Sequence, residues 1–112
     1  MGPYSFATEA GGLVFLSGQV ALDPTTGERS PDDIGDQTRQ VMKNIGALLG
    51  DQGLTYADIA KTTIFLADIA DYPTVNEIYG SYFETEPPAR SALQAGALPG
   101  GFLVEIEVVA AR

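Results

Sequence analysis

The residues best suited to chemistry in this sequence lie towards its C-terminal end. Arg90 stands in the run Pro88-Ala89-Arg90-Ser91, and two glutamates, Glu105 and Glu107, follow within the apolar segment 103–108. A guanidinium group is a planar fork of N–H donors that matches a carboxylate bidentately and stays charged at any working pH. Because the chain has only six Lys and Arg residues, we expect Arg90 to bind an anionic small molecule. The alternative is a structural ion pair with Glu86 or Glu105.

The composition excludes several other kinds of chemistry. The chain has no Cys and no His, so it lacks disulfides, thiolates, the usual general base and the commonest transition-metal ligand. No Asp-x-Asp-x-Asp-Gly loop is present for Ca²⁺ or Mg²⁺. The net charge of −9 repels phosphate backbones, which argues against nucleic-acid binding. We therefore expect a small-molecule ligand and no metal site.

Length and hydropathy indicate one globular domain over residues 1–112. The hydrophobic fraction of 45% is sufficient for a packed core. The N-terminus has no basic segment followed by an apolar one, and no apolar run approaches the roughly 20 residues of a membrane span. These features predict a cytoplasmic protein without a membrane partner.

The first half of the chain predicts a strand and a helix. The apolar run 13–16, placed between glycine-containing segments, is typical of a buried strand. Apolar residues then keep helical spacing from Ile34 to Leu49, with Ser30 as the expected N-cap and Gly50 near the expected end. The aspartates in the first turn of this helix, Asp32, Asp33 and Asp36, are expected to be solvated and to favour the positive end of the helix dipole.

The second half predicts the elements that hold Arg90 and the two glutamates. Residues 62–66 favour a strand, and a second helix is expected to start near Asp71 and to end before Pro87. Its apolar face is expected to contain Val75, Ile78, Tyr79, Tyr82 and Phe83. Two more strands are expected at 91–95 and 103–110. The order β, β, α, β, α, β, β predicts an α+β domain with a mixed sheet and both helices on one face.

Strand alternation suggests that the second face of the sheet is covered by other subunits. Leu13 and Phe15 point one way and Val14 and Leu16 the other, so both faces of this strand are apolar. In the last strand, alternation places Glu105 and Glu107 together on the face opposite to the helices. Since two helices cover one face only, we infer a homo-oligomer; long loops over the second face are the alternative.

The sequence resembles the Rid (reactive intermediate deaminase, YjgF-type) family over nearly its whole length. The resemblance rests on the following motifs, which keep the family's spacing: Gly2-Pro3-Tyr4-Ser5, Leu16-Ser17-Gly18-Gln19, Asp23-Pro24-x-Thr26-Gly27, Gln37-Thr38-x-Gln40, Ile59-Ala60-Lys61-Thr62-Thr63, Val75-Asn76-Glu77-x-Tyr79, Pro88-Ala89-Arg90-Ser91-Ala92-Leu93 with Gly96 and Leu98, and Val104-Glu105-Ile106.

The resemblance implies a chorismate-mutase-like α+β subunit that forms a homotrimer, with a central barrel and clefts between subunits. It implies a 2-iminobutanoate/2-iminopropanoate deaminase, which hydrolyses 2-aminoacrylate, 2-iminopropanoate and 2-iminobutanoate to 2-keto acids and ammonia without a cofactor. The functional alternative is a non-catalytic protein that binds a carboxylate ligand or modulates a partner through the same cleft. A chorismate-mutase-type enzyme is disfavoured, because Arg29, Arg39 and Lys61 form no recognisable cationic motif.

The resemblance also assigns roles to individual residues. It implies that Arg90 binds the substrate carboxylate and that Glu107 positions or activates the hydrolytic water. A partly buried glutamate has a raised pKa, which suits that role; a structural pair at a subunit interface is the alternative for Glu107. For Glu105 we expect a structural or interface role.

The remaining residues of the expected cleft are less specific. The resemblance implies that Tyr4, Ser17 and Asn76 line the cleft, although Tyr4 could merely pack and the other two could bond loops or caps. Ala92 stands where the family commonly has Cys, so its backbone could contact substrate while thiol chemistry is absent. Phe6 replaces a residue that is often polar, which would reshape the mouth of the cleft.

Overall fold

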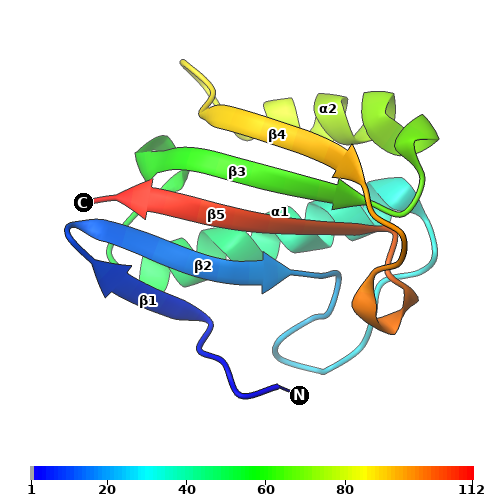
Figure 1. Cartoon of the computed structure of the whole chain (residues 1–112), viewed down its shortest axis with the longest axis horizontal. Helices are drawn as coiled ribbons and strands as arrows, with labels where there is room; N and C mark the ends of the chain where they lie inside the picture. The colour runs from blue at the N-terminus through cyan, green and yellow to red at the C-terminus, as the bar shows by residue number, and fades with distance from the viewer. Residues whose placement is uncertain (1) are drawn as a thin grey trace.

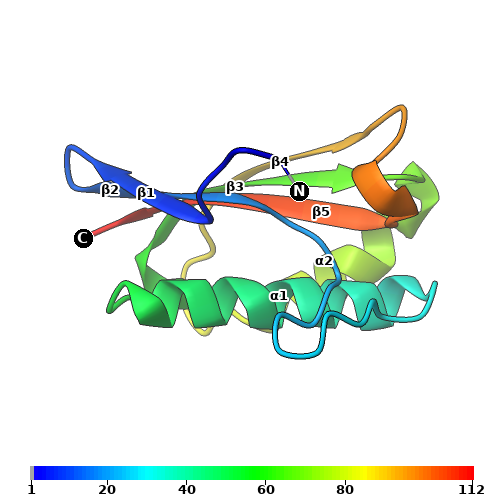
Figure 2. The same cartoon turned by 90° about the horizontal axis from the view of Figure 1, so that it is seen from below.

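A computed structural model describes residues 2–112. Within them, five strands form one mixed sheet in the order β1-β2-β5-β3-β4, and two α-helices pack on one face of it (Figures 1 and 2). The α+β class, the element order and the placement of both helices on one face are confirmed. The elements are β1 Ala7–Ala10, β2 Leu13–Gln19, α1 Ile34–Asp51, β3 Ile59–Leu66, α2 Tyr72–Gly80, β4 Ala89–Gln94 and β5 Val104–Ala111.

The strand pairing places β4 at one edge of the sheet and β5 near its middle. β5 pairs antiparallel with β2 and β3, whereas β3 and β4 are parallel. Parallel neighbours require a crossover connection, and α2 lies within it. This connection explains why a residue of β4 can reach side chains of α2.

Helix α1 begins three residues later than the expected Ser30 cap would place it. The N-cap is Asp33, whose carboxylate accepts the backbone N–H of Asp36 across 2.8 Å. Ser30 donates its own backbone N–H to the carbonyl of Ala21, which ties it to the preceding loop. The capping role predicted for Ser30 is therefore wrong, and the first-turn aspartate takes it.

Helix α2 begins at Tyr72, as expected, but ends at Gly80, well before the two prolines. The Ser81 hydroxyl donates to the carbonyl of Ile78 across 2.6 Å and satisfies one of the free carbonyls at the helix end. Tyr82 and Phe83, predicted to extend the apolar face of the helix, follow it in a turn instead. Neither helix in residues 2–112 has the length and apolar character needed to cross a membrane.

The two faces of the sheet differ as strand alternation predicts. The residues of β5 that face the helices are buried, and Glu105 and Glu107 share the opposite face. On that helix-free face Phe15 is 41% exposed and Leu93 is 43% exposed. This partly exposed apolar face is consistent with the homo-oligomer that we expected. The oligomer itself stays a prediction.

Candidate functional site

Arg90 lies on edge strand β4 and reaches under helix α2, where neutral groups orient its guanidinium. Its Nη1 donates to Asn76 Oδ1 across 2.7 Å, and its Nη2 donates to the Tyr72 hydroxyl across 2.8 Å. The guanidinium carbon also lies 5.4 Å from the ring centroid of Tyr72 and 5.3 Å from that of Tyr79. We call Arg90, Asn76 and Tyr72 the Arg90 group.

Sequence reasoning found two members of the Arg90 group and missed Tyr72. The sequence did contain a signal for Tyr72, because positions 72, 76 and 79 are spaced to lie on one face of a helix. Tyr79, which we expected to be core, is buried and bonds Thr62 Oγ1 through its hydroxyl across 2.7 Å. Burial raises the pKa of Tyr79, although the Thr62 bond and the Arg90 charge lower it. Tyr79 thus supports Arg90 from beneath as a neutral ring.

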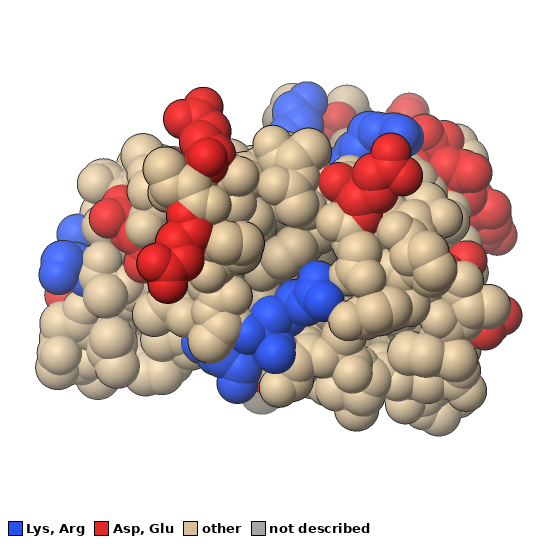
Figure 3. All heavy atoms as spheres, turned by 90° about the horizontal axis from the view of Figure 1, so that it is seen from above, with Lys and Arg blue, Asp and Glu red and all other residues tan. Residues whose placement is uncertain are grey.

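Arg90 has no carboxylate partner among residues 2–112, whereas Arg29, Arg39 and Arg112 each form an ion pair. The pair with Glu86 or Glu105 that we considered is absent from this part of the chain. In the space-filling view from the β4–α2 edge, basic atoms lie in the middle of the face among uncharged ones (Figure 3). A half-buried guanidinium with neutral partners keeps its positive charge available to an external anion.

A second group of candidate residues lines a hollow of about 690 Å³ beside β2 and β5, which we call the Glu105 hollow. Ser17 and Gly18 line this hollow at a point where the β2–β5 pairing is irregular, between Leu16 and Gln19. Such β-bulges often lie next to functional sites. The Ser17 hydroxyl donates to the Ser5 carbonyl across 2.6 Å and so holds the segment that carries Tyr4. The lining residues are Gly2, Tyr4, Ser17, Gly18, Val20, Leu22, Pro99, Gly100, Phe102, Glu105 and Glu107.

Glu105, rather than Glu107, is the half-buried acid of this hollow. Its carboxylate lies over Gly18, where an added Cβ would collide with it, and Phe65 is its partner on β3. Burial raises the pKa of Glu105 above its ordinary value, and the nearby charge of Glu107 raises it further. Glu107 is exposed in the single chain, and the water-positioning role that the resemblance implies for it stays a prediction.

The Arg90 group and the Glu105 hollow lie on opposite faces of the sheet. Arg90 is in register with Thr62 of β3, which is buried on the helix side, whereas Glu105 is in register with Phe65 on the other side. Within residues 2–112 no hydrogen bond or ion pair joins the two groups. A single chain therefore gathers the predicted site residues into two separate groups. We call these two groups, the Arg90 group and the residues that line the Glu105 hollow, the two halves of the site.

The two departures from the family pattern lie in different places. Ala92 packs against the hydrophobic core from β4 and lines neither the Glu105 hollow nor the guanidinium of Arg90. Phe6 is 60% exposed and meets Tyr4 edge-to-face with the ring centroids 6.1 Å apart. Phe6 is thus placed to shape the mouth of the hollow through Tyr4, whereas backbone contact between Ala92 and substrate stays a prediction.

The acidic cluster at the start of α1 is engaged in local contacts. Asp32 pairs with Arg29, Asp36 pairs with Arg39, and Asp33 caps the helix. In the described part of the chain no set of three or more Asp, Glu, His or Cys side chains is placed to hold a metal ion.

Comparisons with known proteins show which family this chain resembles over its whole length. The model of the family described as Endoribonuclease L-PSP matches residues 1–112. The chain is 51% identical over 110 residues to Reactive Intermediate Deaminase A, chloroplastic, of Arabidopsis thaliana, covering 98% of this chain and 59% of that protein. It is 44% identical over 112 residues to 2-iminobutanoate/2-iminopropanoate deaminase of Mus musculus, covering 100% of this chain and 83% of the mouse protein.

Solved structures of similar proteins share the fold of this chain. A protein of unknown function of the conserved Rid protein family, YyfA from Yersinia pestis, superposes with a TM-score of 0.97 at 49% identity, covering 100% of this chain and 90% of that one. TdcF of E. coli, solved with bound serine, superposes with a TM-score of 0.94 at 39% identity, with 100% and 90% coverage.

Proposed function

This chain belongs to the Rid (Endoribonuclease L-PSP) family, and we propose that it hydrolyses reactive imines and enamines of small 2-amino acids to 2-keto acids and ammonia. Its substrates would be 2-aminoacrylate, 2-iminopropanoate and 2-iminobutanoate. Both of the relatives reported above, from Arabidopsis thaliana and Mus musculus, carry deaminase names. The activity would make it a 2-iminobutanoate/2-iminopropanoate deaminase that needs no cofactor.

The observation that carries this proposal is the uncompensated charge of Arg90. All of the proposed substrates have a carboxylate next to the carbon that reacts, and a guanidinium binds a carboxylate bidentately. Asn76 and Tyr72 fix the orientation of the fork and bring no charge of their own. The E. coli relative that was solved with serine binds an amino acid, which has the same α-carboxylate.

We propose that the complete site forms between subunits of a homotrimer. The Arg90 group of one subunit would face the Glu105 hollow of its neighbour, since one chain holds the two halves on opposite faces of the sheet. The partly exposed apolar side chains of the helix-free face, Leu13, Phe15 and Leu93, would supply the apolar surface for the assembly.

In the proposed reaction Arg90 holds the carboxylate while water attacks the neighbouring carbon. An enamine such as 2-aminoacrylate first accepts a proton at C3 and becomes 2-iminopropanoate in its iminium form. Water then adds to C2 and loses one proton. The nitrogen of the adduct accepts a proton, the C2–N bond breaks to release ammonia, and the hydroxyl loses its proton to leave pyruvate. Fixed positions for the carboxylate and the water lower the entropic part of the barrier.

We assign the orientation of the water, and the proton transfers, to Glu105. A raised pKa brings the acid and base forms of a carboxyl closer to balance near neutral pH, which suits a group that both gives and takes protons. Glu107, to which we first assigned this role, would act on Glu105 through its negative charge. Tyr4 and Ser17 would complete the walls around the substrate.

The test is to generate 2-aminoacrylate with a dehydratase and to follow its loss spectroscopically with and without the protein. We expect faster loss with the wild type and no acceleration with Arg90→Ala. Arg39→Ala is the matched control, because Arg39 pairs with Asp36 on the surface of α1, away from both halves. Unchanged decay with wild-type protein would refute the proposed enzyme.

The non-catalytic alternative would bind the ligand without turnover. A titration with 2-ketobutyrate that gave saturable, Arg90-dependent binding, combined with unchanged 2-aminoacrylate decay, would support it. The family description names an endoribonuclease, but a net charge of −9 and the lack of His argue against that activity here. A cytoplasmic location and the absence of nucleic-acid and membrane partners stay predictions.

A further inference from the structure

We propose that Arg29 is a positioning residue of the site, which holds the turn Pro99–Gly101 in the shape that forms one wall of the Glu105 hollow. The effect on substrate affinity rests on the proposed function, because it requires that the hollow bind the substrate. The effect on the turn itself does not.

The turn needs an outside contact because its backbone is unusually free. Gly100 and Gly101 are consecutive and both have positive φ values, 77° and 71°, a region open mainly to glycine. One backbone hydrogen bond closes the turn, from the N–H of Gly101 to the carbonyl of Leu98 across 3.0 Å. Two adjacent glycines lose more conformational freedom on ordering than other residues do, so one such bond is a weak restraint.

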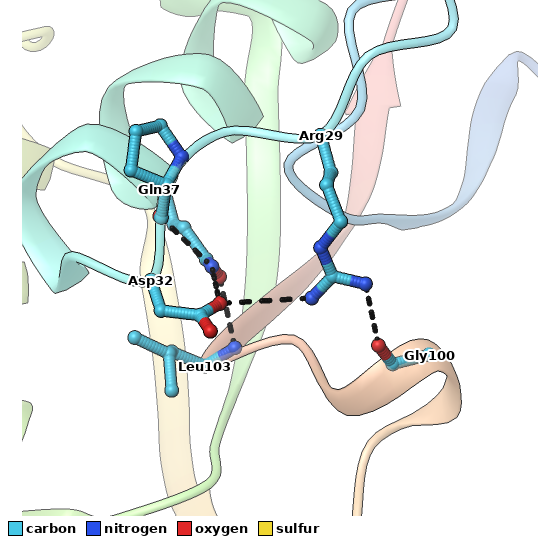
Figure 4. Close-up of polar contacts among 6 residues, drawn as sticks. Arg29, Asp32, Gln37, Gly100 and Leu103 are labelled. Carbon is cyan, nitrogen blue, oxygen red and sulfur yellow. Dashed lines mark hydrogen bonds and ion pairs between the residues drawn. The ribbon is translucent and has the colours of Figure 1, made fainter.

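Arg29 supplies this contact from the loop that follows β2 (Figure 4). Its Nη1 donates to the carbonyl of Gly100 across 2.7 Å, and its guanidinium carbon lies 4.1 Å from the ring centroid of Phe102. Its Nη2 lies 3.7 Å from Asp32 Oδ1. The guanidinium thus fixes both the carbonyl inside the turn and the aromatic ring that follows it.

A buried glutamine holds the other end of the same segment. Gln37 accepts the backbone N–H of Leu103 through its Oε1 across 2.9 Å, and its Nε2 donates to Asp32 Oδ1 across 3.3 Å. Asp32 therefore links the two residues that bond the segment 100–103. Gln37 is buried and Arg29 is exposed, so Arg29 is the member that can be changed without disturbing the core.

The turn connects Arg29 to the site. Pro99, Gly100 and Phe102 line the Glu105 hollow, whereas Arg29 does not. The strand that begins just after the turn, β5, carries Glu105. Arg29 consequently acts through the position of the turn, and its loss should weaken substrate binding more than it slows the chemical step.

The experiment compares Arg29→Met with Arg39→Met. Arg39 also forms an exposed ion pair with an aspartate three residues away, so both variants remove one positive charge and one surface pair, but only Arg29 contacts the turn. We expect Arg29→Met to speed amide hydrogen exchange at Gly101 by about tenfold or more, since tenfold is the lower end of the factor for one lost hydrogen bond to a charged donor. We expect its KM for 2-aminoacrylate to rise about as much with kcat little changed, and Arg29→Lys to recover part of both effects. Arg39→Met should change neither quantity.

The inference would be overturned by unchanged exchange at Gly101, or by faster exchange without a change in KM. An equal fall in kcat and kcat/KM would also overturn it, because it would place Arg29 in the chemical step. If wild-type protein does not turn over 2-aminoacrylate, the proposed function fails, and exchange at Gly101 still decides whether Arg29 holds the turn.

Discussion

Arg90 and Asn76 are joined by a hydrogen bond of 2.7 Å in which the amide, not a carboxylate, accepts from the guanidinium. The pairing leaves the positive charge of Arg90 without a partner of opposite sign in the described part of the chain. A side chain of almost the same shape but with a negative charge is available in aspartate. Replacing the amide at position 76 by an acid therefore tests directly whether the positive charge of Arg90 serves to bind a carboxylate ligand.

We predict that Asn76→Asp will weaken carboxylate binding while leaving the protein folded. The new carboxylate would form an internal ion pair with Arg90 and compete with the substrate, raising KM or the Kd for 2-ketobutyrate by about tenfold or more. The melting temperature should stay equal or rise. Asn76→Ala is the control, because it removes the bond without adding charge and should cost less affinity than Asn76→Asp. Equal losses in both variants would contradict the role given to the charge of Arg90.

A second prediction concerns the contact between Gly18 and Glu105. Gly18→Ala would force the Glu105 carboxylate out of its position, so we expect a large fall in kcat with a smaller change in KM. The matched control is Gly50→Ala in α1, where an added Cβ meets nothing within 4 Å and should stabilise the helix by about 0.5–1 kcal/mol. Full activity of Gly18→Ala would exclude Glu105 from the reaction.

A third prediction uses the raised pKa of Glu105. In the folded chain this pKa lies above its reference value of 4.5 because of burial and of Glu107, so the ionised form lowers stability at neutral pH. This cost disappears as the pH falls through the raised pKa and below 4.5, where the group is protonated in both states. Glu105→Gln should therefore melt higher than the wild type at pH 7, and the difference should shrink on acidification. A difference that does not vary with pH would contradict the assignment.

Most of the architecture was predictable because it follows from local patterns. Alternation along 103–110 correctly separated the buried valines and isoleucine of β5 from Glu105 and Glu107, and the apolar spacing after Ile34 gave helix α1. The end of α2 was not predictable from Pro87 and Pro88, because prolines mark the last possible end of a helix. The actual end at Gly80 depends on Ser81 bonding back to Ile78.

The identity of the half-buried acid could not be predicted from alternation alone. Because Glu105 and Glu107 lie on the same face of β5, strand alternation cannot show which of the two is half-buried. What separates them is the irregular pairing of β2 around Ser17 and Gly18, which makes room for one carboxylate, together with Phe65 on the neighbouring strand. Both depend on the register between strands distant in sequence. Tyr72, by contrast, was within reach, since it precedes Asn76 by four residues on the same helix.

The most direct measurement is complementation between two inactive variants. Arg90→Ala removes one half of the site and Glu105→Ala the other, so neither should be active alone. Mixed by co-refolding in equal amounts, they should recover about a quarter of the wild-type turnover of 2-aminoacrylate, because random assembly pairs two intact halves at about one interface in four. Arg90→Ala mixed with Asn76→Asp, both altered in the Arg90 group, is the control and should show no more turnover than the two variants give separately. No recovery in the first mixture, with mixed oligomers confirmed by mass, would contradict a site shared between subunits.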